Sequence, residues 1–183
     1  MSVTNFVYRD DFFTKQSKSK DNKMNEKQKE MTLIIFSNDM DKAIAAFILA
    51  TGAASSGMKV NMFFTFWGLS LLRKKNYSRK GKTLIERVFG SMLPEGPDGT
   101  RLSKMNFFGA GTKMMKSIMR KKKIFQLNEL MDMAVSLETK IEACTTSMEM
   151  MGIKKEELID NIEVGGVVTY LGSARESAIN LFI

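Results

Sequence analysis

The sequence contains no histidine, a single cysteine (Cys144) and two prolines in 183 residues. Without histidine, the chain cannot build a Ser–His–Asp or Cys–His catalytic site, an HExxH zinc site or any imidazole metal ligand. A single cysteine excludes both an intramolecular disulfide and a CxxC zinc site. We therefore expect no metal and no cofactor. No secretory signal is visible, so a reducing cytoplasm is the expected location.

The positive charge of the chain is concentrated in one segment. Residues 73–123 hold 15 Lys or Arg and three acidic residues, a net charge of +12, whereas the remainder holds 13 basic and 17 acidic residues, a net charge of −4. This distribution predicts a local basic face rather than a surface that coats nucleic acid. Phe107 and Phe108 are the only aromatic residues in the second half of the segment. Because single-stranded nucleic acid is bound by stacking on exposed aromatics, we do not expect a nucleic-acid partner.

The composition divides the chain into an arm and one domain. Residues 1–30 are polar and Lys-rich, and we expect a flexible arm there because such a segment cannot bury enough apolar surface to fold. The 44% hydrophobic content of the chain is sufficient for a core. We expect a single domain over residues 31–183, with the basic residues in an insert at about 77–123.

Apolar runs and helical patterns alternate along this domain. Short apolar runs predict strands at 32–36, 59–66, 140–144, 162–164 and 178–183. Helical patterns fall at 40–56, 67–76, 112–121, 126–136, 145–151, 154–160 and 165–173. The alternation predicts a three-layer α/β/α sandwich around a doubly wound, mostly parallel sheet of about five strands. The apolar stretch 43–54 is too short for a membrane span, which needs about 20 residues.

Ligands bind beyond the carboxyl ends of the strands in an open parallel sheet. The residues that this rule selects are Cys144, as the reactive group, and the expected pocket mouth of Ser37, Asn38, Trp67, Gly68, Thr145, Gly165 and Gly166. Gly165 and Gly166 either present free backbone N–H groups to an anion or form a tight turn without a ligand. Trp67 and Gly68 either line a pocket or pack against the core.

Cys144 lies where a predicted strand turns into a predicted helix. A thiol at a helix N-terminus feels the positive end of the helix dipole, which favours the thiolate and lets a cysteine act as a nucleophile without a histidine. The alternative is that Cys144 is a small buried hydrophobe at the end of a strand.

The basic insert leaves three interpretations open. Its apolar stripe consists of Met114, Met115, Ile118 and Met119, beside Lys113, Lys116 and residues 120–123. This helix either lies on a membrane surface or binds the acidic face of a partner, for which methionine is an adaptable contact. In the third interpretation the methionines cover the core and the lysines are solvated.

Several segments together resemble a known family. They are LIIFSND at 33–39, FTFWGL at 64–69, KIEACTTSMEMMGI at 140–153, EELID at 156–160 and GGVVTYL at 165–171. These segments resemble the DsrE/DsrF/DsrH-like superfamily over residues 31–183. They are most similar to its longer branch, whose insert carries sequences like SKM at 103–105 and GAGTK at 109–113.

The resemblance implies a doubly wound α/β fold and sulfur-relay chemistry. In DsrE- and TusD-like sulfurtransferases a cysteine after a central strand carries a persulfide between partner proteins, and Cys144 matches that cysteine. Sulfur donor and acceptor proteins are then the implied partners, and a trimer or hexamer is the implied assembly. A cytoplasmic sulfur carrier is therefore our first hypothesis.

Two other functions compete with the sulfur carrier. The first is a non-catalytic binding or assembly module that docks on a membrane surface or an acidic partner through the basic insert, with Cys144 inert. The second, a thiol peroxidase, is the least favoured, because no Pro-x-x-x-Thr-x-x-Cys arrangement surrounds Cys144 and a lone cysteine would need an external resolving thiol.

Overall fold

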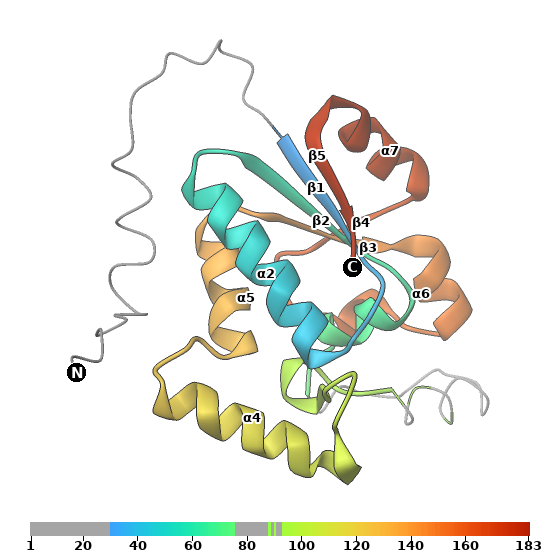
Figure 1. The fold of residues 1–183 in the computed structure, drawn as a ribbon. Helices are drawn as coiled ribbons and strands as arrows, with labels where there is room; N and C mark the ends of the chain where they lie inside the picture. Colours follow the sequence, from blue (N-terminus) through green and yellow to red (C-terminus); the bar gives the residue numbers. More distant parts are fainter. Residues whose placement is uncertain (1–29, 76–87, 89, 91–92) are drawn as a thin grey trace.

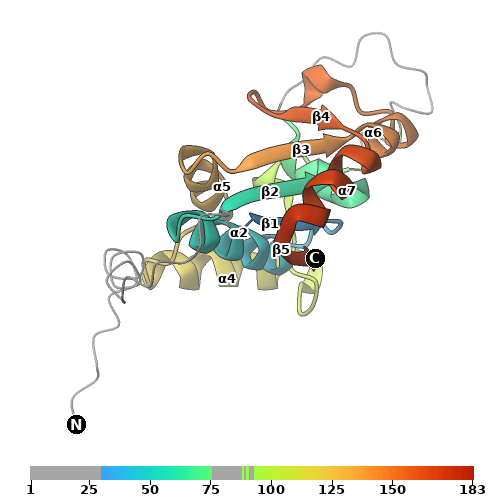
Figure 2. The same ribbon diagram turned by 90° about the horizontal axis from the view of Figure 1, so that it is seen from above.

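The computed structural model of the chain describes residues 30–75, 88, 90 and 93–183. The predicted flexible arm, apart from Glu30, and much of the first half of the predicted insert lie outside these residues. In the described residues one sheet contains β1 (Glu30–Ile35), β2 (Lys59–Phe64), β3 (Lys140–Cys144), β4 (Glu163–Gly165) and β5 (Ser177–Phe182). Their order is β4-β3-β2-β1-β5, as Figure 2 shows, and every neighbouring pair is parallel. The predicted α/β fold with a parallel sheet is confirmed.

Helices cover the two faces of the sheet. α2 (Met40–Ser55) and α5 (Leu127–Ser136) lie on one side and α7 (Val167–Glu176) on the other (Figure 1). Since strand side chains alternate between faces, Leu33 and Ile35 enter the main core with Phe47 of α2. Ile34 points the other way and packs in a smaller cluster beneath α7. The layers are therefore helix, sheet and helix, and the α7 side has the thinner core.

Local sequence signals determine several helix ends. α5 begins at a capping box, in which the backbone N–H of Gln126 donates to Glu129 Oε2 at 2.8 Å. α6 (Thr145–Met151) covers the range that its pattern predicts and ends at Gly152, whose φ of 62° is the left-handed conformation that glycine adopts readily. α7 runs three residues beyond its predicted end at Ser173.

Two predicted helices are wrong in form. The segment predicted as a helix at 67–76 is a 3₁₀ helix, η2 (Phe66–Leu72), and the one at 154–160 contains only a short 3₁₀ turn, η5 (Lys155–Glu157). The backbone becomes extended directly after each of these turns, at Arg73 and at Leu158. These two residues pair in an antiparallel bridge. The backbone N–H of Lys74 donates to Glu157 O at 2.7 Å. Pairing between distant segments thus outweighs their local helical preference.

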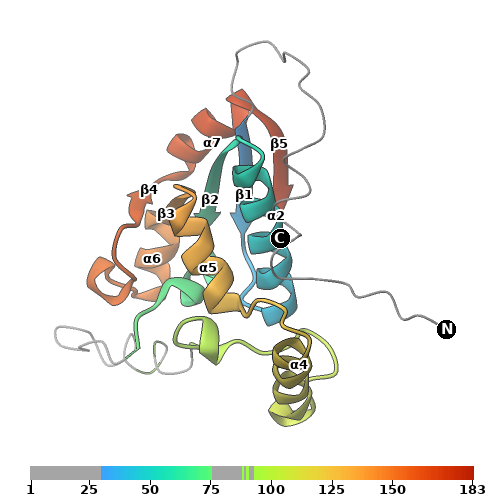
Figure 3. The same cartoon turned by 90° about the vertical axis from the view of Figure 1, so that its left-hand side faces the viewer.

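The described part of the insert ends in a helix outside the sheet layers. It contains two short turns, η3 (Pro97–Gly99) and η4 (Phe107–Gly109), and then α4 (Ala110–Lys121), which lies beyond the main body of the domain (Figure 3). The loop before α4 is tied to α2, because Ser103 donates to Asp41 from its backbone N–H at 2.8 Å and from its hydroxyl at 2.6 Å.

The methionine stripe of α4 covers the core at one position only. Met119 is buried, whereas Met114, Met115 and Ile118 are exposed. The interpretation that the whole stripe packs on the core is therefore wrong for three of its four residues. Among the described residues, no helix combines the length and apolar content needed to cross a bilayer.

Candidate functional site

Cys144 occupies the junction of β3 and α6. It is the last residue of β3 and the N-cap of α6, and its thiol is free. In the neighbouring strand its register partner is Gly165, the last residue of β4. The carboxyl ends of two adjacent parallel strands therefore meet at the thiol, which is where this class of sheet places its ligands.

The thiol lies beneath α7. Cys144 is 6% exposed and packs in a small cluster with Phe63 of β2 and Tyr170 of α7. The rings of Phe63 and Tyr170 have centroids 5.0 Å apart, an aromatic contact that holds α7 on this face of the sheet. Tyr170 is the only buried residue of α7. Tyr170, together with the partly buried Ala174 of the same helix, therefore covers Cys144.

A buried carboxylate lies on the same face of β3 as the thiol. Glu142 is two residues before Cys144, so both side chains point toward the α7 side. Glu142 is 1% exposed, and its Oε2 lies 3.2 Å from Lys140 Nζ. Lys140 also pairs with Glu163 at 3.1 Å. Partial burial acts to lower the pKa of Lys140, but Glu163 and Glu142 outweigh it, so the pKa is raised and the ammonium charge is retained beside both carboxylates.

The structure divides the predicted mouth residues into two groups. Thr145, Gly165 and Gly166 adjoin Cys144 through the chain and the β3–β4 pairing, and a Cβ on Gly166 would lie 3.9 Å from Thr145 Oγ1. Ser37, Asn38 and Gly68 lie at the end of β1, which β2 separates from β3. There Gly68 donates its N–H to Phe36 O at 2.9 Å, and a Cβ on it would meet Ile35 O at 2.1 Å. Only glycine fits that approach.

Ser37 and Trp67 both have local hydrogen-bond partners, since the backbone oxygen of Trp67 accepts the hydroxyl of Ser70 at 2.7 Å. The hydroxyl of Ser37 donates to Asp39 Oδ2 at 2.9 Å and accepts the backbone N–H of Asp39 at 3.1 Å. Ser37 thus shapes the turn into α2. Trp67 stands partly exposed, at the start of η2. The end of β2 does reach α6, because the hydroxyls of Thr65 and Ser147 are hydrogen-bonded at 2.7 Å.

A cavity of about 370 Å³ lies between α6, the turn after it and β4. It is lined by Thr145, which follows Cys144, and by Val164, which precedes its register partner Gly165. The other lining residues are Met148, Glu149, Gly152, Ile153 and Lys154. Cys144 is not among the lining residues, and Met148, Ile153 and Val164 pack with the main core rather than with the cluster that contains Cys144. The thiol is therefore not part of this cavity.

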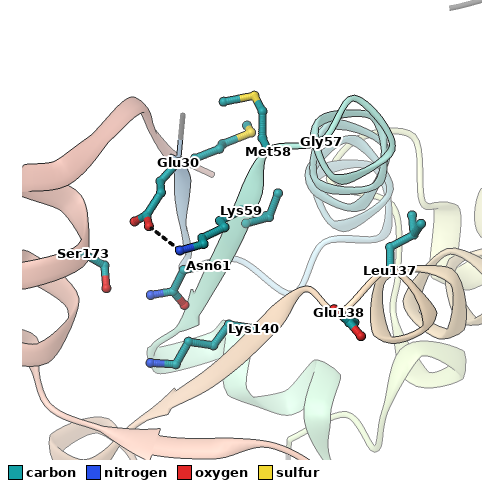
Figure 4. A pocket seen from close by; sticks show the side chains of 11 residues that line it. Glu30, Gly57, Met58, Lys59, Asn61, Leu137, Glu138, Lys140 and Ser173 are labelled. Carbon is teal, nitrogen blue, oxygen red and sulfur yellow. Dashed lines mark ion pairs between the residues drawn. The ribbon is translucent and has the colours of Figure 1, made fainter. Parts of the chain in front are cut away.

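A second cavity, of about 410 Å³, is lined by residues at the amino ends of β1, β2 and β3 (Figure 4), whereas the predicted mouth is at the carboxyl ends of the strands. Its two lysines are already paired, Lys59 with Glu30 at 3.7 Å and Lys140 with the two glutamates described above. Asn61 lies between them, buried. The cavity therefore offers no excess positive charge to an anion.

Sequence reasoning missed Glu142 and Tyr170. Glu142 could have been found from the sequence, because it is a charged residue in the predicted strand and, two positions before Cys144, shares its face. Tyr170 gave no comparable signal, because its contact with Phe63 depends on how α7 folds back over the sheet.

The chain matches one family model and two curated proteins over most of its length. Residues 27–182 match the model of the DsrE/DsrF/DrsH-like family. The chain is 44% identical over 160 residues to the uncharacterized protein YrkE of Bacillus subtilis, which covers 87% of this chain and 100% of that protein. It is 35% identical over 162 residues to the sulfur carrier protein DsrE2 of Allochromatium vinosum, covering 85% of this chain and 99% of that protein.

Among solved structures, the ychN protein of E. coli superposes with a TM-score of 0.48 at 10% identity, over 84% of this chain and 99% of that one. The family match spans β1 through β5 and includes Cys144 with the strands on either side of it. The chain therefore belongs to the DsrE/DsrF/DrsH-like family.

Proposed function

We propose that this protein is a sulfur carrier, in which Cys144 receives a sulfur atom from a donor persulfide and delivers it to the thiol of an acceptor protein. The observation that carries the proposal is the position of the free thiol, at the carboxyl end of β3 and beside the end of β4. A relative 35% identical to this chain is named a sulfur carrier protein, which supports the same chemistry here.

The proposed transfer is a pair of thiol exchange steps. In the first, the Cys144 thiolate attacks the terminal sulfur of the donor persulfide, R–S–SH. The new S–S bond forms as the old one breaks, and the donor leaves as R–S⁻, which takes up a proton. In the second, an acceptor thiolate attacks the terminal sulfur on Cys144, and Cys144 leaves as the thiolate. The steps need no oxidant or reductant, and their rates depend on thiolate fraction, leaving group and access.

Access to the thiol requires that its cover opens. Cys144 is 6% exposed beneath Tyr170, so a donor protein cannot reach it while α7 is seated. Tyr170 is the only fully buried residue of α7, Ala174 packs beside it in part, and the exposed residues of the helix include Val167, Val168 and Leu171. In the proposal, a partner that binds this exposed apolar face displaces α7.

A transfer assay tests the proposal. The protein is loaded with a polysulfide, freed from excess reagent and mixed with a small thiol acceptor, and the transferred sulfane sulfur is quantified. We expect about one sulfur per chain from the native protein and none from Cys144→Ser.

A relocated thiol is the matched control. Cys144→Ser combined with Ser136→Cys places the only cysteine on the exposed surface of α5. The proposal expects this variant to load and release less sulfur than the native chain under the same conditions. Equal turnover by both proteins, or no sulfur retained by the native chain, contradicts a role for the β3 position.

A further inference from the structure

We infer that α4 and the turn before it form a binding surface for anionic membrane lipids. The surface consists of the exposed apolar residues Met105, Phe107, Phe108, Met114, Met115 and Ile118, together with the basic residues of 101–123. It lies at the far end of the molecule from α7, as Figures 1 and 3 show. We call it the α4 surface.

The charge of the α4 surface is of one sign. Residues 101–123 contain eight basic residues and no Asp or Glu. The eight are Arg101, Lys104, Lys113, Lys116, Arg120, Lys121, Lys122 and Lys123. Within the part of the chain that the structure describes, none of their side chains is ion-paired, and only the side chain of Lys116 makes a hydrogen bond, to the backbone oxygen of Asp98. The charge of Lys116 also acts on the nearby Asp98 carboxylate and helps to lower its pKa, after the hydrogen bond from Lys75. The other seven side chains present positive charge without an acidic partner among the described residues.

The exposed apolar residues of α4 form a stripe along the helix, between its basic side chains and the face that packs on the domain. Met114 and Ile118 are four residues apart and lie on one face of the helix. Met119 is buried, so the helix is attached along an adjacent face. Lys121, three residues beyond Ile118, borders the exposed stripe. A helix that rests on a bilayer has this arrangement, an apolar face with long cationic side chains along its flank that reach the headgroups.

The turn before α4 presents two aromatic rings to solvent. Phe107 is 69% exposed and Phe108 is completely exposed. Both residues have positive φ, 43° and 54°, a conformation that bulky side chains rarely adopt. The turn is held against α4, because Thr112 Oγ1 accepts the N–H of Leu102 at 3.0 Å and donates to Asn106 at 2.8 Å. The exposure of the two rings is therefore built into a structured turn.

Charge complementarity and the fully exposed ring favour lipid over an acidic protein. The side chains of an acidic protein surface can pair with the lysines, but they do not provide an apolar layer in which the exposed methionine and phenylalanine side chains can be buried. An anionic bilayer provides both, a layer of negative headgroups and acyl chains beneath them, and each Lys or Arg near such a surface adds to binding. The α4 surface carries both kinds of group in one continuous segment.

Vesicle flotation of the full-length protein tests the inference. Vesicles of phosphatidylcholine with about 30% phosphatidylglycerol are compared with pure phosphatidylcholine, at salt concentrations of about 0.05 M and about 0.5 M. We expect binding to the anionic vesicles at low salt and at least about a tenfold loss at high salt. Absence of binding to anionic vesicles above the neutral level overturns the inference.

Paired variants separate the two kinds of group. Lys122→Glu with Lys123→Glu should weaken binding at least about tenfold, whereas Lys155→Glu with Arg175→Glu, the same charge change elsewhere, should not. Phe107→Ser with Phe108→Ser should also weaken it, whereas Val168→Ser with Leu171→Ser on α7 should not. If the native chain ignores vesicles but binds polyglutamate in a manner lost with Lys122 and Lys123, the surface serves an acidic protein instead. Cys144→Ser should bind vesicles like the native chain, so failure here is distinct from failure of the sulfur-carrier proposal.

Discussion

The carboxylate of Glu142 fills the space that a side chain at position 165 would need. A Cβ built on Gly165 would lie 1.7 Å from Glu142 Oε1 and 2.7 Å from Glu142 Cδ. Because Gly165 is also the register partner of Cys144, the buried carboxylate, the glycine backbone and the thiol form one packed unit at the ends of β3 and β4. Glu142 therefore excludes any side chain at position 165, and this explains the glycine there without a bound anion.

We predict that Gly165→Ala destabilises the protein by about 1–3 kcal/mol, because the buried, ion-paired Glu142 cannot move aside freely. In a Glu142→Ala background the same change should cost less than about 1 kcal/mol, since the obstructing atoms are gone. Urea denaturation measures both. Gly172→Ala on α7, where nothing lies within 4 Å of the added Cβ, is the control and should be neutral or stabilising. Equal costs for Gly165→Ala in the two backgrounds would show that Glu142 is not the obstacle.

Tyr170→Ala should expose the thiol. Loss of the only buried side chain of α7 loosens the cover, and we expect Cys144 to react with a thiol reagent about tenfold faster, corresponding to about 1.4 kcal/mol of easier opening. Tyr170→Phe keeps the ring and should label like the native protein, as should Val168→Ala on the exposed side of α7. Far-UV circular dichroism must show that Tyr170→Ala remains folded. An unchanged labelling rate in a folded Tyr170→Ala protein would mean that α7 does not control access.

The buried ion pair of Arg73 and Glu157 joins the two segments whose helices were wrongly predicted. Arg73 Nη2 lies 3.8 Å from Glu157 Oε2, and Arg73 Nη1 donates to Leu93 O at 3.1 Å. Removing one charge leaves the other buried, so Arg73→Met and Glu157→Gln should each cost about 3–5 kcal/mol. The double variant should cost less than their sum by about 1–3 kcal/mol. Denaturation of all four proteins measures this coupling, and strict additivity would rule it out.

The contact between Asp41 and Ser103 predicts a pH-dependent attachment of the insert. Burial acts to raise the pKa of Asp41, but the hydrogen bonds from Ser103 outweigh it and hold the pKa below 3.8. A lowered folded-state pKa means that the stabilisation is present above the unfolded-state value and is lost as the pH falls through the folded-state value.

Asp41→Asn should therefore cost up to about 1 kcal/mol at neutral pH, a modest amount because the pair is exposed. The difference from the native protein should shrink as the pH falls below about 4. Unfolding measured at several pH values tests this, with Asp132→Asn on α5 as the control for the loss of one carboxylate. A difference that persists unchanged at low pH contradicts the assignment.

Local patterns were sufficient to predict the central elements. The run Thr32–Ile35 is apolar on both faces because the strand is covered on both sides, and α6 follows β3 where the apolar run of the strand ends. The helix predicted at 126–136 differs from α5 by one residue. These elements are specified by their own side chains.

Features that depend on distant contacts were not predictable in the same way. Arg73 and Leu158 pair across the chain, and their pairing replaced the predicted helices. The burial of Cys144, which its position in the sequence leaves as one alternative, is confirmed. Its contact with Tyr170, which follows another strand, is not indicated by any local pattern around the cysteine. The trimer or hexamer that the family resemblance implies, and the identities of the sulfur donor and acceptor, stay predictions.

The central claim is that Cys144 carries transferable sulfur, and intact-protein mass spectrometry after incubation with a persulfide donor tests it most directly. We predict a gain of one sulfur, about 32 Da, assigned by peptide mapping to Cys144, removed by an acceptor thiol and absent in Cys144→Ser. The claim would be contradicted if neither the folded native protein nor the folded Tyr170→Ala variant gained this mass.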